Sequence, residues 1–558
     1  MTRTQVPWRL SALALGVGLI GALAGCGGGG GDSGTSNSNT SNLAGSGNQL
    51  TLDVFGARGG TLAAASGNCP GGATVNWTTP GQAAPVSGNY IDDPNPSQPL
   101  TVSVSCGGVS ATQTLAPQNV FASSSVFAVT NPDGTLAVWG SSRLGGDTSV
   151  LKVQPQNVVK VVGSERAWAA LQSDGTVVTW GRPASGGSYA GKGGAGSADY
   201  TGAVAPLNKV SNVWAVKRGF VALNGDGSGT AWGNLEQTFD GEGGFSSIAS
   251  FFTPATLAQF SNIADVSYTE GAVAVLKKDG TVFAFGDPAS GGDTTPVAAK
   301  LTNVAKIYAT DYSFTALKKD GSVVTWGQNF DNATTGLYDG TEPMPQANLA
   351  LLSNSNVIAA LSQNGVVSTI GTTMFDRGSD LSGFSGGLAN VAKVFASKTA
   401  FAALKKDGTV ASWGDSQRNN VANVQAQLTN VLTIAGTETA FAALKADGTV
   451  VTWGDETRGG DSSAVQSQLN NVIALFSNDY AFAALKKDGT VVTWGSPTHG
   501  GDSSAAQAKL RNIRAIYSTG LGGFLAVAKD GKFVTWGSPF AGGGQAPANL
   551  TAIPFLKS

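Results

Sequence analysis

The stretch TAFAALKADGTVVTWG, residues Thr439 to Gly454, decides the architecture of this 558-residue chain. Two segments of strand length, Ala440–Lys445 and Thr449–Trp453, flank the pair Asp447-Gly448. Asp-Gly between apolar runs predicts a β-hairpin, because a tight two-residue turn needs positive φ angles. The first segment is apolar on both of its faces, which predicts a strand buried between two layers.

This unit recurs, with decay, ten times between about Val126 and Gly537, at spacings of 40 to 53 residues. A fixed period in this range indicates a repeat architecture. The small alanines let neighbouring layers approach closely, and a large residue fills the remaining gap, as blades around an axis require. The positions aligned with the tryptophan are Trp139, Trp180, Trp232, Phe285, Trp326, Ile370, Trp413, Trp453, Trp494 and Trp536.

Each unit also begins with a lead segment of pattern N-[VI]-x-x-[IL], such as Asn430–Ile434, which predicts a third strand. The segment before it, for example Ala464–Leu469, is a candidate fourth strand. Gly-Gly-Asp recurs after the Trp-Gly pair, as in Gly459–Asp461, and indicates a connecting turn.

The motif A-[FV]-A-A-L-K-x-D-G-T-V-x-x-W-G resembles the repeat of the regulator-of-chromosome-condensation (RCC1-like) β-propellers, from about Asn119 to the C-terminus. The short period is similar to that of bacterial secreted members, one of which inhibits β-lactamases. The resemblance implies an all-β propeller, and propellers typically have four to eight blades. Ten units leave open a single ten-bladed ring, an open superhelical array and two smaller rings. The nuclear nucleotide-exchange activity of the best-known member is not expected here.

The two ends of the repeat region suggest how it closes. The first lead segment, Asn119–Ser125, is shorter than the others, and Asn549–Ile553 repeats a lead segment with no hairpin after it. We therefore expect a C-terminal strand that completes the first blade and covers two open sheet edges, which would otherwise favour aggregation.

The N-terminus, residues 1–25, has the pattern of a signal peptide, with an apolar stretch too short for a typical membrane span. Leu23-Ala24-Gly25-Cys26 resembles a bacterial lipobox, which implies cleavage before Cys26 and diacylglyceryl attachment to its sulfur. Gly27 in place of Asp favours the outer membrane. Residues 26–48 have the Gly, Ser and Asn composition of a flexible tether. The expected location is the bacterial cell envelope, with membrane contact only through the lipid.

Residues 49–116 precede the repeats of 117–558 and predict a small Ig-like β-sandwich, from short alternating segments separated by Pro and Gly. The chain has three cysteines. With Cys26 lipidated, Cys69 and Cys106 remain as a pair, and a pair outside the cytoplasm is expected to form a disulfide.

Insertions enlarge several repeat units, and loop insertions on a repeat scaffold are common binding sites. The ligand expected here is a protein or a glycan. Lysine pairs, such as Lys405-Lys406, recur before the hairpin aspartates; they indicate solvated hairpin ends, with a band that binds an anionic glycan as the alternative. The candidate binding residues of the insertions are Tyr189, Tyr200, Phe239, Phe245, Phe251, Phe252, Phe330 and Tyr338.

The sequence gives little support for catalysis, metal binding or a cofactor, and none is assigned. The formal net charge of −2 argues against nucleic acid. The single histidine, His499, lies in a predicted turn, which disfavours a zinc site or a Ser-His-Asp triad. Asp240 and Glu242 form a candidate carboxylate pair for glycoside hydrolysis. Asn224–Ser228 weakly resembles a calcium loop but aligns with the hairpin turn.

The predicted function is that of a monomeric, non-enzymatic, lipid-anchored binding scaffold. One alternative is a carbohydrate-active enzyme with carboxylates in the insertions of units three and four. Another is a propeller-type inhibitor of an extracytoplasmic hydrolase. These classes differ in whether insertion carboxylates converge in a cleft and whether a hydrolase forms a stoichiometric complex.

Overall fold

The structure is a computed structural model. In the part of the chain that it describes, no helix is long and apolar enough to cross a membrane. It describes residues 40–42 and 49–554, apart from 70–71, 81–83, 94, 150, 152–153, 183–184, 188–208, 234–258, 329–336, 340–347, 372–377, 379, 385–387, 416–418, 545 and 551.

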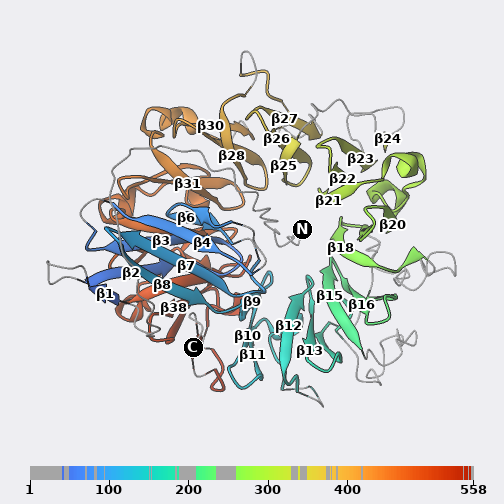
Figure 1. Cartoon of the computed structure of the whole chain (residues 1–558), viewed down its shortest axis with the longest axis horizontal. Helices are drawn as coiled ribbons and strands as arrows, with labels where there is room; N and C mark the ends of the chain where they lie inside the picture. The colour runs from blue at the N-terminus through green and yellow to red at the C-terminus, as the bar shows by residue number, and fades with distance from the viewer. Residues whose placement is uncertain are drawn as a thin grey trace.

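The repeats form ten antiparallel sheets, called blades one to ten in chain order, and the described residues give nine of them three strands and blade five a fourth. In each blade the lead strand lies innermost, the AFAALK-type strand lies in the middle, and the strand ending in Trp-Gly lies outside (Figure 1). The all-β propeller class is therefore confirmed. The strands are β9 (Val120–Ala122), β10 (Val126–Thr130), β11 (Leu136–Gly140), β12 (Val158–Gly163), β13 (Ala167–Gln172), β14 (Val177–Gly181), β15 (Val210–Val216), β16 (Gly219–Asn224), β17 (Gly229–Gly233), β18 (Ile263–Tyr268), β19 (Ala272–Lys277), β20 (Val282–Gly286), β21 (Val304–Ala309), β22 (Ser313–Lys318), β23 (Val323–Gln328), β24 (Leu337–Asp339), β25 (Asn348–Ser353), β26 (Val357–Ser362), β27 (Val367–Gly371), β28 (Val391–Ala396), β29 (Ala400–Lys405), β30 (Val410–Gly414), β31 (Val431–Gly436), β32 (Ala440–Lys445), β33 (Val450–Gly454), β34 (Val472–Ser477), β35 (Ala481–Lys486), β36 (Val491–Gly495), β37 (Ile513–Ser518), β38 (Gly523–Ala528) and β39 (Phe533–Gly537).

The blades close into a single ring, because blade ten contacts blade one as other neighbouring blades contact each other (Figure 1). At this seam the Trp139 indole Nε1–H donates to the Gly542 carbonyl at 3.0 Å. The same bond joins Trp494 of blade nine to Gly459 of blade eight, at 3.0 Å. The open array and the two smaller rings are thus excluded.

Burial between blades explains the repeated motif. Phe441 and Ala443 of β32 pack toward blade seven, in a cluster with Ala402 of its middle strand. The other face of β32, with Ala442, packs against Phe482 of blade nine. The middle strand is therefore buried on both faces, as its sequence predicts, and each alanine face meets the aromatic face of the next blade.

The Asn of the lead motif joins neighbouring hairpins. Asn430 adopts a left-handed conformation with φ of 55°. Its carbonyl accepts the Ala446 amide of its own hairpin at 2.8 Å, while the next amide, Val431 N–H, donates to Gly408 of the preceding hairpin at 2.9 Å. Asn tolerates this conformation better than most non-glycine residues, which accounts for its recurrence.

The candidate fourth strand is wrong. The segment expected to hold it in blade nine is a 3₁₀ helix, η9 (Ser463–Gln468), which ends at buried Leu469. This helix lies between β33, the outer strand of blade eight, and β34, the lead strand of blade nine. Leu469 is buried at its end, although the segment pairs with no strand. The other 3₁₀ helices among the described residues are η1 (Ser142–Leu144), η4 (Pro288–Ser290), η5 (Thr295–Lys300), η6 (Val421–Asn423), η7 (Gln425–Gln427), η8 (Glu456–Arg458), η10 (Pro497–His499), η11 (Gln507–Lys509) and η12 (Pro539–Ala541).

The predicted C-terminal strand is also wrong, although the segment does lie at the seam. Blade one keeps its own short lead strand, β9, and the described part of 549–554 is not a strand. The Ile553 amide donates to Gly531 of the last hairpin at 2.9 Å, as the Val431 amide does to Gly408 and the Ile513 amide does to Gly489. Leu550 and Ile553 are buried in the core that blades ten and one share with the sandwich. We call this segment around Leu550 and Ile553 the C-terminal latch. It supplies the beginning of a lead segment that blade one lacks.

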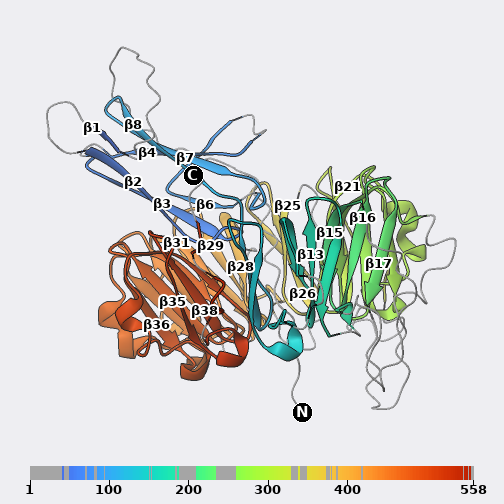
Figure 2. The same cartoon turned by 90° about the horizontal axis from the view of Figure 1, so that it is seen from below.

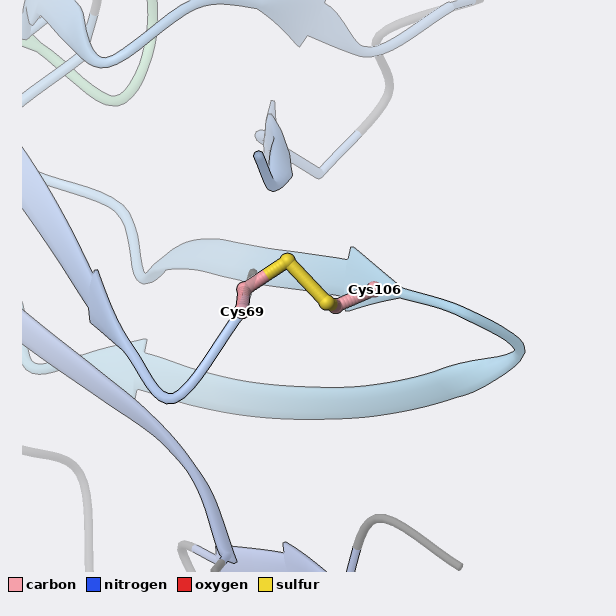
Figure 3. Close-up of a disulfide and its surroundings, with 2 residues drawn as sticks. All are labelled: Cys69 and Cys106. Carbon is pink, nitrogen blue, oxygen red and sulfur yellow. A yellow bond between two sulfur atoms is a disulfide. The ribbon is translucent and has the colours of Figure 1, made fainter. Parts of the chain in front are cut away.

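Ahead of the propeller stands a sandwich of two four-stranded sheets, ordered β1-β2-β3-β6 and β5-β4-β7-β8. β1 pairs with β2, so the sandwich takes in three residues that the sequence assigned to the tether. Cys69 and Cys106 form the expected disulfide, which joins the end of β3 to β7 (Figure 3). The strands are β1 (Thr40–Asn42), β2 (Gln49–Phe55), β3 (Thr61–Gly67), β4 (Thr74–Thr78), β5 (Val86–Ser87), β6 (Tyr90–Asp92), β7 (Leu100–Cys106) and β8 (Val109–Leu115).

The sandwich lies on one face of the ring, over blades seven to ten, and reaches blade one (Figures 1 and 2). Phe55 of β2 enters the apolar core of blades nine and ten. The next amide, Gly56 N–H, donates to the Arg514 carbonyl of blade ten at 2.8 Å. We call this face of the propeller the sandwich-side face. It carries the Asp-Gly hairpins and the beginnings of the lead strands.

Candidate binding surfaces of the propeller

Of the eight aromatic residues predicted to bind from the insertions, Tyr338 lies among the described residues. Tyr338 lies in β24, opposite Gly327 of β23. The other seven lie outside the described residues, so their convergence on one rim stays a prediction: Tyr189, Tyr200, Phe239, Phe245, Phe251, Phe252 and Phe330.

The hairpin lysines lie on the sandwich-side face, and one of them, in blade ten, contacts a carboxylate of the sandwich. Lys529 occupies the second lysine position in the blade-ten hairpin, and its Nζ contacts Asp53 of the sandwich at 2.7 Å. Lys278 and Lys319 occupy the same position in blades four and five and are exposed. The hairpin aspartates are turn residues, since Asp447 accepts the amide and hydroxyl of Thr449, which lowers the pKa of its carboxyl.

Lysines also line the inner strands, each beside an aromatic ring. Lys306 Nζ lies 5.0 Å from the Tyr308 ring centroid, and Lys393 Nζ lies 4.9 Å from that of Phe395. In blade two, Lys160 Nζ lies 5.6 Å from the Trp214 ring of blade three. Such distances suit cation–π attraction. The sequence reasoning missed these residues; for Lys306 and Lys393 the signal was the Asn-Val-Ala-Lys tetrad followed two residues later by an aromatic.

The charges around these inner lysines differ between sectors of the ring. Lys393 pairs with Asp92 of the sandwich. The pKa of Lys306 is lowered by burial, and the nearby Asp265 partly offsets that shift. Burial raises the pKa of Tyr308 to about 12, so its hydroxyl stays protonated at neutral pH. The inner strand of blade five thus holds a lysine whose charge is only partly compensated.

The opposite face carries a ring of turns between lead and middle strands. Neighbouring turns bond through their backbones: the Glu438 amide donates to Asp479 at 3.1 Å, and Asp479 donates to Gly520 at 3.1 Å. Glu438 also pairs with Lys398 at 3.0 Å and with Arg458. Burial, and then the charge of Glu438, raise the pKa of Asp479 to about 7. These turns stitch neighbouring blades together.

The described residues show no catalytic arrangement around His499. Its ring stacks on Tyr480 at 4.2 Å, and its Nδ1 lies 2.9 Å from the hydroxyls of Ser496 and Thr498. Burial, with a smaller effect of Arg458, lowers the pKa of His499. Among the described residues no group of three or more His, Cys, Asp or Glu could hold a metal ion.

The remaining chemical candidates come from blades three and four. Asp226, in the weak calcium pattern, accepts the Ser228 amide at 2.9 Å and its hydroxyl at 2.6 Å, as other hairpin aspartates do with the residue two positions on. Asp240 and Glu242 fall outside the described residues, so the carboxylate pair stays a prediction.

Comparisons with known proteins return propellers of low similarity. No protein-family model matches the chain, and no curated protein matches it. The yeast RCC1 protein Prp20, solved with Kap60, is 17% identical over 54% of this chain and 80% of its own, with a TM-score of 0.30. The ectodomain of the Physcomitrella patens receptor kinase CR4 is 17% identical over 49% and 72%, with a TM-score of 0.29. Human WBSCR16 is 15% identical over 66% and 87%, with a TM-score of 0.28. Such likeness carries no argument about function, and the propeller assignment rests on the strand order.

Proposed function

We propose that this protein is an exported, lipid-anchored scaffold that binds a protein or a glycan through its propeller and catalyses no reaction. The observation that supports binding most strongly is internal to the chain. The propeller already holds a second domain on one face, through Lys393–Asp92, Lys529–Asp53 and the buried ring of Phe55. Such a face, with cations around an apolar contact, has the composition of a recognition surface.

The division of labour within each repeat supports the same proposal. The Phe, Ala, Leu and Trp side chains of the motif are buried between blades, and the Asp-Gly pair forms the turn. These residues hold the ring rigid, so the residues that vary between units are left for recognition. The lipobox at Cys26 and the tether behind it would hold this scaffold at the membrane surface.

Two experiments test this proposal. Metabolic labelling with radioactive palmitate should mark the wild type and not Cys26→Ser, which should leave the membrane fraction. An unlabelled wild-type chain would contradict the anchor.

Binding is tested with the full mature chain on arrays of glycans and of purified envelope proteins. Alanine at Tyr189, Tyr200 and Phe239 should weaken binding, whereas Phe540→Ala is the matched control, because Phe540 is 54% exposed on a 3₁₀ turn. Equal loss in both variants would contradict the role of the insertions.

A further inference from the structure

We infer that the sandwich-side face of blades four and five binds an acidic polypeptide segment, at lysine positions equivalent to those that hold the sandwich. We call this region the open sector; it comprises Lys278, Lys306, Tyr308 and Lys319. The inference rests on the proposed binding function and names the class of ligand. In Figure 1 the sandwich strands lie over blades seven to ten, and blades four and five lie across the ring from them, uncovered by those strands.

The repeat places one lysine in both sectors. Asn303–Lys306 and Asn390–Lys393 have the same sequence, Asn-Val-Ala-Lys, and each lysine lies about equally far from the ring two residues later, at 5.0 and 4.9 Å. Lys393 contacts the Asp92 carboxylate of the sandwich. Lys306 therefore presents the same cation at the equivalent position of the ring, with Asp265 of blade four as the acidic group that acts on it.

The hairpins repeat the comparison at a second point. Lys529 holds Asp53 at 2.7 Å, while Lys278 and Lys319 stand exposed at the equivalent position. The lead strands and Asp-Gly hairpins of blades four and five, all described, carry five lysines against three aspartates, an excess of two positive charges. A segment with carboxylates would therefore be attracted and held there. The lysines are Lys277, Lys278, Lys306, Lys318 and Lys319, and the aspartates are Asp265, Asp279 and Asp320.

A backbone contact favours a polypeptide over a glycan. Arg514 is the bulged second residue of the lead strand β37, outside the ladder pairing, and its carbonyl accepts the Gly56 amide at 2.8 Å. Ala305 is the bulged residue at the equivalent position of β21 and is exposed. A peptide amide can donate to this carbonyl while an acidic side chain reaches Lys306, which combines main-chain and side-chain recognition.

The test uses the full mature chain and a fluorescein-labelled peptide of about ten residues in which Asp and Val alternate. We expect saturable binding by fluorescence anisotropy, with affinity that falls as salt rises. Each lysine that is replaced removes one charge pair with the peptide, which weakens binding by up to about threefold. Lys306→Gln with Lys319→Gln should therefore weaken binding about tenfold. Lys509→Gln, an exposed lysine of η11, is the matched control and should bind as the wild type does.

Three outcomes decide the inference. Equal affinity of the double variant and the Lys509→Gln control overturns it. Should Lys306→Gln fail to fold, Lys278→Gln with Lys319→Gln replaces it, since both side chains are exposed. An alginate oligosaccharide that binds the open sector while the peptide does not overturns the polypeptide assignment and leaves the scaffold proposal standing. If neither the peptide nor the oligosaccharide binds, and no glycan or protein on the arrays binds either, both this inference and the proposed binding function are contradicted.

Discussion

Ring closure by the C-terminal latch gives a quantitative prediction. Leu550 is 4% exposed and Ile553 is 1% exposed, in a core that also contains Trp139 of blade one and Leu525 of blade ten. Removing such a side chain costs about 2–5 kcal/mol, from lost transfer free energy and the cavity left behind. Leu550→Ala with Ile553→Ala should therefore lower the free energy of unfolding by about 4–10 kcal/mol. The two sites are close, so the sum is an upper range.

The assay is urea unfolding followed by tryptophan fluorescence, since most of the aligned tryptophans lie between blades. Leu510→Ala with Ile513→Ala, the equivalent pair in the lead segment of blade ten, is the positive control, because both residues are fully buried. Phe540→Ala is the surface control and should change stability by about 0.5 kcal/mol or less. An unchanged urea midpoint in the latch variant, with a clear loss in the blade-ten variant, would refute the closure role of 549–553.

Three further predictions concern the sandwich and the ring of turns. Replacing Cys69 and Cys106 by Ser should lower the free energy of unfolding by about 3–4 kcal/mol, because the disulfide closes a 37-residue separation; calorimetry should show a lower transition temperature, and an unchanged transition would contradict this. Burial raises the pKa of Asp479 to about 7, well above the ordinary value for an aspartic acid, so its contribution to stability is present in acid and is lost as pH rises toward 7. Asp479→Asn should flatten the fall in the urea midpoint between about pH 4 and pH 7, and an unaltered pH profile would contradict the assignment. Lys393 and Asp92, 40% and 27% exposed, should show a double-mutant coupling below about 1 kcal/mol that shrinks with salt, and a salt-independent coupling would contradict a screened surface pair.

Local sequence predicted the repeated part of the fold well, because the residues that determine the structure of each unit lie within that unit. The Asp-Gly turn, the two-faced Ala-Phe-Ala-Ala-Leu strand and the buried Trp all lie within about fifteen residues, and turn chemistry and burial pattern decide them. The Cys69–Cys106 disulfide followed from counting the cysteines. The 3₁₀ helix at Ser463–Gln468 was mistaken for a possible strand, because a short apolar run does not distinguish the two.

The functional surface could not be predicted in the same way, because it depends on where distant segments meet. Nothing in the sequence near Asp53 or Asp92 states that these carboxylates meet Lys529 and Lys393, which lie hundreds of residues away. The inner lysines alternate with apolar residues like those of any half-buried strand. Their significance appears only once the ring places Lys306 and Lys393 at equivalent positions, one beneath the sandwich and one in the open sector.

Hydrogen exchange with and without the alternating Asp-Val peptide tests most directly where this protein binds its ligand. At saturating peptide, we expect slower exchange in β21 (Val304–Ala309), which contains Lys306 and Tyr308, and in the neighbouring β18 (Ile263–Tyr268), which contains Asp265. The turns of the opposite face, such as Thr437–Thr439, should exchange as before. Protection confined to those turns, or unchanged exchange throughout the propeller at saturation, would contradict recognition on the sandwich-side face.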